Sequence, residues 1–264
     1  MRIVRFDRGE KKPAYGIIEG DRIRVAKGDP LNELKATRST VAFSEAKLLA
    51  PVEPANILAL GQNYKAHVEE GGDTLPKAPI MFMKATTSVV GPGDPIRIPK
   101  VAPAEVDYEA ELALVIGKTA RHVKESEALD YVLGYMCAND VSARDCQRAD
   151  GQWIRAKSFE TFCPLGPWIE TELNPLDCGI RCRVNDKVLQ DANTSLMIFN
   201  VPYVISYLSA GMTLLPGTVL LTGTPAGVGF AQNPPRFLRS GDVVEVEVDG
   251  IGALRNPVIA DAAS

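Results

Sequence analysis

The chain has 264 residues, of which 45% are hydrophobic and 23% charged, and its formal net charge is -4 at pH 7. This length allows one large domain, or a main domain with a small appendage, and the composition is ordinary for a globular protein. The acidic balance leaves no basic surplus for gripping a phosphate backbone, so we expect no nucleic-acid partner. No apolar run approaches the ~20 residues that cross a bilayer, and the charged opening is unlike a signal peptide, so we expect no membrane contact and a cytoplasmic location.

The first segments of the chain alternate apolar and polar residues between charged or glycine turns, in MRIVRF, AYGIIEG and DRIRVA. This pattern predicts a small β-rich N-terminal domain over residues 1–50, which ends at the boundary marked by Pro51 and Pro54. Longer apolar strands such as ILALG, ELALVIG and TVLLTG follow, and they predict a main domain over residues 55–264. Helical periodicity is convincing only at 124–131 and 202–209, with a brief turn after Asn63. We therefore predict a strand-dominated α+β fold with a mixed sheet, closing with a hairpin around residues 249–250.

The most informative segment is VDYEAELALVIGK, which starts at residue 106. As a strand it places apolar side chains on one face and Asp107, Glu109 and Glu111 on the other. Residues two apart on a strand lie ~7 Å apart at the backbone, so the tips of Glu109 and Glu111 can converge on one ion. The alternative is a solvated strand face that carries acids without any ligand.

A third carboxylate, Asp140, follows an apolar run in GYMCANDVSARDCQ, at a position typical of a strand end. With Glu109 and Glu111 it would form a hard, all-oxygen site that selects Mg²⁺ or Mn²⁺, or Ca²⁺ in a crystal, over softer metals. The alternative for Asp140 is a structural turn residue. Only two histidines are present and neither accompanies a cysteine pair, so a tetrahedral zinc site is not expected, and the five cysteines are predicted to be buried thiols.

Six motifs together resemble the fumarylacetoacetate hydrolase superfamily, in the right order over residues 57–258. They are GQNYKAHVEE, PIMFMKATTSVVGP, VDYEAELALVIGK, GYMCANDVSARDCQ, KSFETFCPLGPW and LLTGTPAGVG. The resemblance implies a mixed sheet rolled into a sandwich-like barrel, assembled as a homodimer, and it assigns the metal to Glu109, Glu111 and Asp140. The small N-terminal unit resembles the shorter members of the superfamily, such as acylpyruvases and 2-hydroxyhepta-2,4-diene-1,7-dioate isomerases.

Further residues are candidates for catalysis. His67 and Glu70 are three apart, so a short helix would place both on one face, where the carboxylate can orient an imidazole that takes a proton from water. Lys157 offers an ammonium for a substrate oxygen or for developing enolate charge. The alternatives are a surface histidine and a surface lysine. The resemblance favours catalysis, because the family's short lid helix carries the same histidine–glutamate pair and the matching lysine points into the pocket.

Substrate contacts are expected from two more motifs. The resemblance implies that the side chains of Arg144 and Gln147 point into the pocket. Arg144 could instead form a structural ion pair with Asp145 or Asp150. It also assigns a carboxylate-cradling role to the TGTPAGVG loop, through its exposed amides, including that of Gly223, and the Thr224 hydroxyl. The loop lacks the features of a nucleotide-binding loop, and a purely structural turn is the alternative.

These residues predict an enzyme that acts on a small 2-oxo acid. Our first hypothesis is hydrolysis of a C–C bond in an acylpyruvate-like 2,4-dioxo acid through a metal-stabilised enolate, because the histidine–glutamate pair supplies water activation. The alternative is an isomerase or decarboxylase of unsaturated 2-oxo dicarboxylic acids from aromatic catabolism. A third possibility, from a different class, is a non-catalytic metal-binding module.

Overall fold

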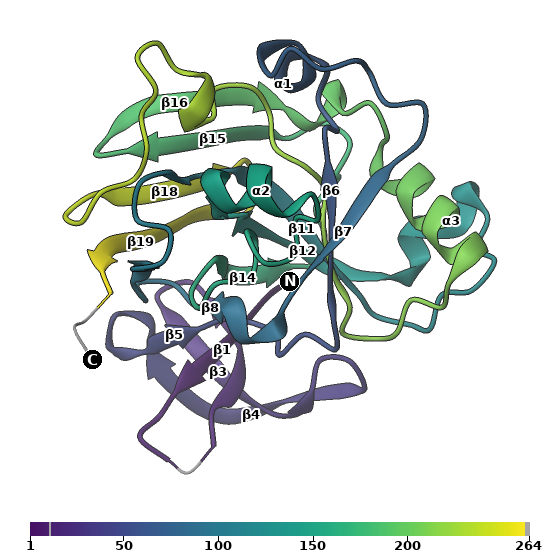
Figure 1. Ribbon diagram of the computed structural model, residues 1–264. Helices are drawn as coiled ribbons and strands as arrows, with labels where there is room; N and C mark the ends of the chain where they lie inside the picture. Colours follow the sequence, from purple (N-terminus) through teal and green to yellow (C-terminus); the bar gives the residue numbers. More distant parts are fainter. Residues whose placement is uncertain (11, 262–264) are drawn as a thin grey trace.

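The computed structural model describes residues 1–10 and 12–261, and strands dominate it, as predicted (Figure 1). The N-terminal segment is an antiparallel meander followed by a short return strand, drawn in purple at the bottom of Figure 1. Its elements are β1 (Arg2–Asp7), β2 (Ala14–Glu19), β3 (Arg22–Asp29), β4 (Glu33–Ala42), η1 (Phe43–Glu45) and β5 (Lys47–Leu49). The predicted small β-rich N-terminal unit is therefore present.

One large mixed sheet contains this meander and the central strands of the main body. Its order is β4-β3-β2-β1-β14-β12-β11-β17-β6-β7, with β5 paired to β1 and β8 paired to β14. The members beyond the meander are β6 (Ile57–Gly61), β7 (Ile80–Lys84), β8 (Val89–Val90), β11 (Ala110–Ile116), β12 (Val132–Asn139), β14 (Cys163–Glu170) and β17 (Val219–Leu221). The β6–β17 and β8–β14 pairs are parallel, and the other pairs are antiparallel.

A second sheet packs across the centre of the first. Its order is β16-β15-β18-β19-β9, from β9 (Ile96–Ile98), β15 (Gly179–Val184), β16 (Lys187–Asn193), β18 (Val243–Val248) and β19 (Gly252–Ala260). The predicted hairpin joins β18 to β19, and Gly250 in its turn has a φ of 83°, which favours glycine. A separate two-stranded ladder pairs β10 (Val106–Asp107) with β13 (Ser142–Ala143).

Strand β11 is buried on both faces. Leu112, Leu114 and Ile116 pack into the core between the two sheets. Ala113 and Val115 pack on the opposite side, in a cluster that also contains Ile3 from the N-terminal meander. The solvated strand face considered from sequence is thus wrong, because the side of β11 that carries Glu111 is buried as well, by the cluster that includes Ile3.

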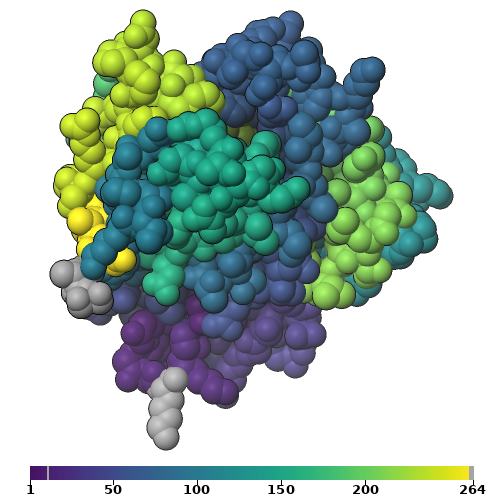
Figure 2. Space-filling model, viewed as in Figure 1, coloured from purple at the N-terminus to yellow at the C-terminus, as the bar shows by residue number. Residues whose placement is uncertain are grey.

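The helices are few and short. They are α1 (Lys65–Glu70), α2 (Arg144–Asp150) and α3 (Val201–Gly211), with 3₁₀ turns η2 (Thr86–Ser88), η3 (Glu125–Tyr131), η4 (Thr194–Leu196) and η5 (Gly229–Ala231). The two predicted helical segments correspond to η3 and α3, which pack together on the right of Figure 1. Helix α2 was not predicted, and it lies on the front surface in the teal region of Figure 2.

The five cysteines are free and buried, as predicted. Among the described residues, no helix combines the length and the apolar character needed to cross a membrane.

Candidate metal centre and active site

Three carboxylates meet at one end of the β11–β12 pair. Glu109 precedes β11, Glu111 lies within it, and Asp140 directly follows β12. The antiparallel register pairs Ala110 with Asn139, so the strand end that carries Asp140 lies beside both glutamates. Side-chain oxygens of the three residues lie within 4.8 Å of one another, and all three residues are buried. The sequence therefore correctly anticipated that these carboxyl groups come together.

The donor set fits a hard divalent cation. Glu111 Oε2 accepts a hydrogen bond from the Gly223 amide at 2.6 Å, but its Oε1 is buried without a hydrogen-bond partner among the described residues. Burial raises the pKa of Glu111 well above its usual value, and the neighbouring carboxylates Asp140 and Glu109 raise it further. A buried, unpartnered carboxylate oxygen facing two others is the arrangement that a cation would stabilise. Glu109, Glu111 and Asp140 would hold that cation.

Two buried lysines flank the cluster. Lys157 Nζ donates to Glu109 Oε2 and to Asp140 Oδ2, both at 2.8 Å, while Lys84 Nζ pairs with Asp140 Oδ1. Burial alone would raise the pKa of Glu109, but Lys157 and Arg144 outweigh it and lower that pKa. Burial likewise opposes the charge of Lys157, but Asp140 and Glu109 raise its pKa above the ordinary value. Lys157 is therefore a fixed ammonium with its third N–H bond left for another acceptor.

Arg144 is the first residue of α2 and lies in a cage of acceptors. Its Nε donates to Asp107 Oδ2 at 2.9 Å, its Nη2 pairs with Glu109 Oε1 at 2.7 Å, and its Nη1 donates to Gln147 Oε1 at 2.9 Å. The alternative partners Asp145 and Asp150 are wrong, since strand β10 brings Asp107 closer. Nη2 faces Glu109 as an ion pair but has no hydrogen-bond partner among the described residues, so its two N–H bonds and one on Nη1 remain for a ligand.

Asp107 organises this side of the site. Its carboxylate accepts hydrogen bonds from the backbone amides of Tyr108, Gly229 and Phe230, at 2.9, 2.7 and 3.0 Å, as well as from Arg144. Burial raises the pKa of Asp107, and Arg144 acts against that rise. Asp107 thus joins the metal-binding strand to α2 and to the 229–230 turn.

Charge is nearly balanced within this buried network. Four carboxyl groups face three cationic side chains: Asp107, Glu109, Glu111 and Asp140 against Lys84, Arg144 and Lys157. A divalent cation would reverse the sign of the site, and an anionic ligand would then be favoured.

Helix α1 brings His67 and Glu70 together. His67 Nδ1 lies 2.8 Å from Glu70 Oε1, and the other carboxylate oxygen accepts from the Gly227 amide at 2.8 Å. An ionised carboxylate only accepts hydrogen bonds, so it places the imidazole proton on Nδ1 and leaves a free lone pair on Nε2. The His67–Glu70 pair thus has the geometry of a general base held in place by a carboxylate. The hydrogen bond from Gly227 to Glu70 also joins α1 to the loop that follows β17.

That loop uses its amides differently from our expectation. The Gly223 amide, predicted to face a substrate, is occupied by Glu111, and the Gly227 amide is occupied by Glu70. This prediction is corrected, because buried carboxylates compete for the donors. Thr224 does line the cavity, and its Oγ1 accepts a 2.8 Å hydrogen bond from Gln190, so the hydroxyl proton is free to point elsewhere.

A cavity of about 110 Å³ opens at this site. It is lined by Leu60, Gly61, Gln62, His67, Asp73, Glu109, Arg144, Gln147, Trp153, Lys157, Thr224 and Phe230. It is smaller than the roughly 300–1,000 Å³ of sites for drug-sized ligands, so it suits a small acid. Among the predicted site residues, Glu109, His67, Lys157, Arg144, Gln147 and Thr224 lie on its wall, whereas Glu70, Glu111, Asp140 and Gly223 contact these or each other without lining it.

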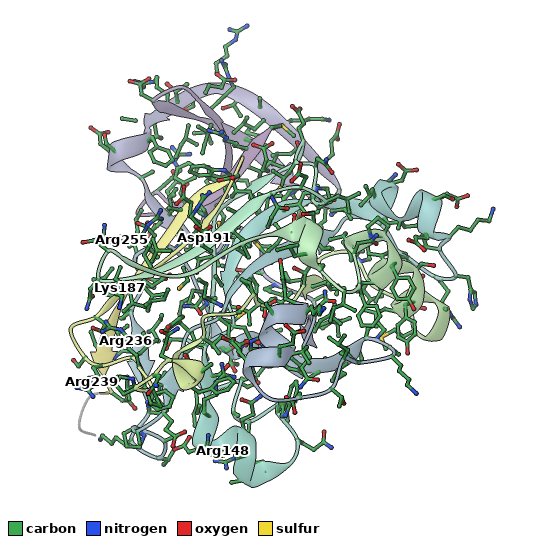
Figure 3. All side chains as sticks on the ribbon, turned by 90° about the horizontal axis from the view of Figure 1, so that it is seen from above. Arg148, Lys187, Asp191, Arg236, Arg239 and Arg255 are labelled. Carbon is green, nitrogen blue, oxygen red and sulfur yellow. The ribbon has the colours of Figure 1, made fainter. Side chains whose placement is uncertain are left out.

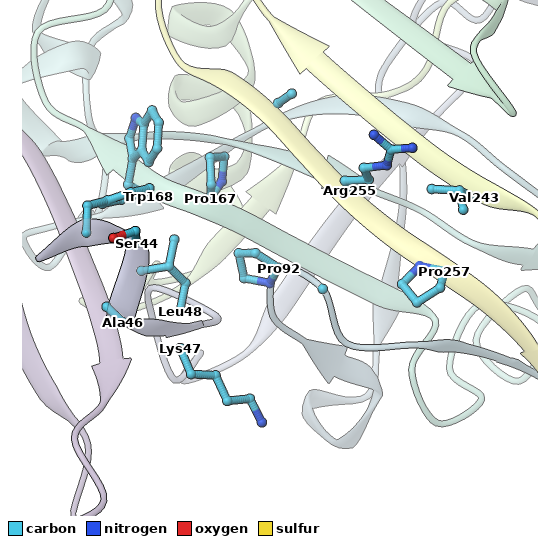
Figure 4. Close-up of a pocket in the computed structure, with 13 residues that line it drawn as sticks. Ser44, Ala46, Lys47, Leu48, Pro92, Pro167, Trp168, Val243, Arg255 and Pro257 are labelled. Atoms are coloured by element: carbon cyan, nitrogen blue, oxygen red, sulfur yellow. The ribbon is translucent and has the colours of Figure 1, made fainter. Parts of the chain in front are cut away.

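A larger cavity of about 720 Å³ lies elsewhere, between the η1–β5 segment and the main body (Figure 4). Trp168, Pro92 and Pro257 give it apolar walls, with Lys47 and Arg255 at its edge. Glu109 of the carboxylate cluster lines the smaller cavity, whereas the described lining of this larger one contains none of the three carboxylates.

Three positioning residues were missed from sequence. They are Asp107, Lys84 and Gln190, all buried and all bonded to predicted site residues. Asp107 stood in the noted D-x-E-x-E pattern, and a lysine at the end of an apolar strand was a signal for Lys84. Nothing in the local sequence marks Gln190, which reaches Thr224 from the second sheet.

The fold and the site together define a class: enzymes that act on small molecules at a buried all-carboxylate site suited to a divalent metal. The chain belongs to the fumarylacetoacetate hydrolase family, since the profile "Fumarylacetoacetate (FAA) hydrolase C-terminal" matches residues 56–259. A second profile, "Rv2993c-like, N-terminal", matches residues 1–51.

Relatives and solved structures agree with this placement. The oxaloacetate tautomerase fahd2, mitochondrial, of Xenopus laevis is 48% identical, over 86% of this chain and 72% of the relative. The 2-hydroxyhepta-2,4-diene-1,7-dioate isomerase of Mycobacterium marinum is 40% identical, with a TM-score of 0.89 over 100% of both chains. The 5-carboxymethyl-2-hydroxymuconate delta-isomerase of Mycobacterium smegmatis is 42% identical, with a TM-score of 0.90 over 99% of this chain and 100% of that one.

Proposed function

We propose that this chain catalyses metal-dependent keto–enol isomerisation of a small 2-oxo dicarboxylic acid, with oxaloacetate as the first candidate. The observation that carries the proposal is the 110 Å³ cavity, where a carboxylate cluster meets the cations Lys157 and Arg144. Relatives named as a tautomerase and as isomerases support it and favour our alternative over hydrolysis. A dianionic substrate suits the charge of the metal-loaded site.

The residues divide the work. When bound, a divalent cation supplies positive charge that withdraws electrons from a nearby carbonyl group and acidifies the adjacent C–H bond. His67 Nε2 accepts the proton from that carbon, while Glu70 holds the imidazole and stabilises its charged form. Lys157 donates its free N–H to the oxygen that gains charge, and Arg144 with Gln147 binds a carboxylate. Return of the proton to this oxygen completes the isomerisation.

Acylpyruvate hydrolysis is the second candidate. The specific observation in its favour is the unpaired Nε2 of His67 on the cavity wall, since the same lone pair can take a proton from water. In isomerisation His67 takes a proton from a substrate carbon, whereas in hydrolysis it takes one from water.

A substrate panel with Mg²⁺ or Mn²⁺ tests the proposal. Ultraviolet absorbance follows the enol of oxaloacetate, and pyruvate release separates both decarboxylation and acylpyruvate hydrolysis from isomerisation. We expect isomerisation to be the fastest activity. If an acylpyruvate is cleaved faster than the oxaloacetate forms interconvert, hydrolysis replaces the proposal.

The metal and the assembly belong to the same proposal. Three carboxylates favour Mg²⁺ or Mn²⁺, and exposed apolar side chains on the edge strand β7, Ile80 and Met83, support a homodimer. Metal analysis of the purified protein and light scattering test these two points.

A further inference from the structure

Phe230 contacts both His67 and Arg144, the two groups that are expected to handle the substrate. Its ring meets the His67 ring edge-on, with 6.4 Å between the centroids, and the Arg144 guanidinium carbon lies 4.7 Å from its centroid. It also lines the 110 Å³ cavity. A side chain placed in this way limits how far a ligand held near His67 can extend towards Arg144.

The backbone that carries Phe230 is fixed on both sides. Asp107 accepts hydrogen bonds from the amides of Gly229 and Phe230, and Arg236 N donates to Gly229 O at 2.9 Å. A Cβ at Gly229 would lie 2.1 Å from the Arg236 carbonyl oxygen and 2.4 Å from Asp107 Oδ1, so the turn packs closely against both residues. The backbone of this wall residue is therefore held on both sides.

Trp153 forms another wall of the same cavity. A Cβ at Gly61 would lie 2.3 Å from its ring, and Phe82 packs against it edge-on at 5.4 Å. The cavity thus has little freedom to widen on this side either.

We infer that Phe230 determines substrate length, admitting 2-oxo dicarboxylates of four or five carbons and excluding those of seven. The inference rests on the proposed function for the class of ligand. It goes further by separating four-carbon substrates such as oxaloacetate from the seven-carbon dienedioates in the names of relatives. Asp107 is the positioning residue that holds the wall in place.

The test measures binding, so it does not depend on turnover. The Mg²⁺-loaded full-length protein is titrated calorimetrically with oxaloacetate, 2-oxoglutarate, 2-oxoadipate and 2-oxopimelate. The native chain should lose about tenfold or more in affinity between the five-carbon and the seven-carbon acid, since even one methylene matters this much in a tight pocket. Phe230→Ala should reduce this loss to under about threefold, and Phe230→Leu should give an intermediate value and serve if the alanine variant fails to fold.

Phe237→Ala is the matched control. It removes the same ring from the same loop, but Phe237 lies in a separate groove of about 370 Å³ beside Lys187, Arg236 and Arg239, whose positions are labelled in Figure 3. This variant should keep the native length dependence.

The inference is overturned if the native chain binds the seven-carbon acid as tightly as the four-carbon one, or if the Phe230 variants weaken every acid equally. The inference is also overturned if Phe237→Ala reduces the dependence of affinity on acid length as much as Phe230→Ala does. Binding of none of the four acids removes the inference together with the proposed substrate class. Length-dependent binding without isomerisation of oxaloacetate would remove only the proposed function.

Discussion

In the described part of the chain, Glu111 contributes the one oxygen of the three-carboxylate cluster that is buried without a hydrogen-bond partner, so it is the member that most needs a cation. We predict that Glu111→Gln weakens Mg²⁺ binding by more than the ~100-fold that loss of an outer-shell partner can cost. The metal-free variant should stay folded, because the burial and neighbouring carboxylates that raise the pKa of Glu111 already disfavour its charge.

Thermal unfolding with and without Mg²⁺ measures this effect. At about a hundred times its dissociation constant, a ligand stabilises the native state by about 2.7 kcal/mol, and that increment should disappear in the variant. Glu160→Gln is the control, since Glu160 is exposed and outside the cluster. An unchanged Mg²⁺ effect in Glu111→Gln would contradict the metal site.

Lys157 should separate metal binding from catalysis. Lys157→Met removes a cation that lies 2.8 Å from both Glu109 and Asp140, so Mg²⁺ should bind as tightly as before or more tightly. Turnover should fall about a hundredfold or more, because the donor for the developing charge is lost. Calorimetry and steady-state rates measure the two quantities, with Lys187→Met, at an exposed site, as control. Equal losses of binding and turnover would refute the assigned role.

At the residue scale, the sequence predicts which side chains form the site better than it predicts their hydrogen-bond partners. Glu109 and Glu111 follow from strand periodicity, and Asp140 follows from its place after an apolar run. The hydrogen-bond partners of Gly223 and Arg144 cannot be predicted in this way, because both are distant in the sequence. The Gly223 amide donates to Glu111, and the Arg144 guanidinium donates to Asp107. Competition among buried donors and acceptors has no local signature.

Helix α1 has six residues, too few for a stable isolated helix, so its contacts must hold it. Glu70 links it to Gly227 and Gln62 bonds Asp73 just beyond its end, at 2.8 and 2.6 Å. We predict that Glu70→Gln lowers kcat about a hundredfold, because His67 loses its charged partner. Faster amide hydrogen exchange should accompany this loss in α1.

Glu69→Gln is a closely matched control for that change. Glu69 is the neighbouring residue on the same helix, but it is exposed, and its ion pair within residues 1–10 and 12–261 is with Lys65, at 3.6 Å. Its replacement should leave both kcat and exchange near the native values. Similar losses in the two variants would show that helix charge matters, and not the contact with His67.

At the element scale, local pattern locates long strands well and short segments poorly. The acidic segment was expected to be one strand, but it is divided into β10 and β11, and Asp107 of β10 and Glu109, between the two strands, both pair with Arg144. Helix α2 escaped prediction because its sequence, RDCQRAD, has only one strongly apolar side chain and hence no periodic apolar face. Both departures lie at the site, where function sets the local structure.

For the whole molecule, the small N-terminal unit is continuous with the main sheet. Strand β1 pairs with β14, with Ile3 opposite Ile169, and β5 pairs with β1 on the return. Ile3, Ala50 and Val52 share one apolar cluster with Ala113 and Val115 of β11, on the side of β11 that carries Glu111. The N-terminal unit also has a small cluster of its own, formed by Val4, Phe6, Ile23 and Val25, but the shared cluster crosses the predicted boundary near residues 50–55.

This continuity predicts a single cooperative unfolding transition. Ile3→Ala should destabilise the entire chain by about 2–5 kcal/mol, the usual cost of a large-to-small change in a core, and it should shift that one transition without splitting it. Calorimetry, together with metal-dependent activity measured at the same temperatures, checks whether the site is lost with the meander. Ile18→Ala, at a half-buried position on β2, is the control and should cost clearly less. An early separate transition in Ile3→Ala, with activity retained above it, would show instead that residues 1–50 fold as an independent domain.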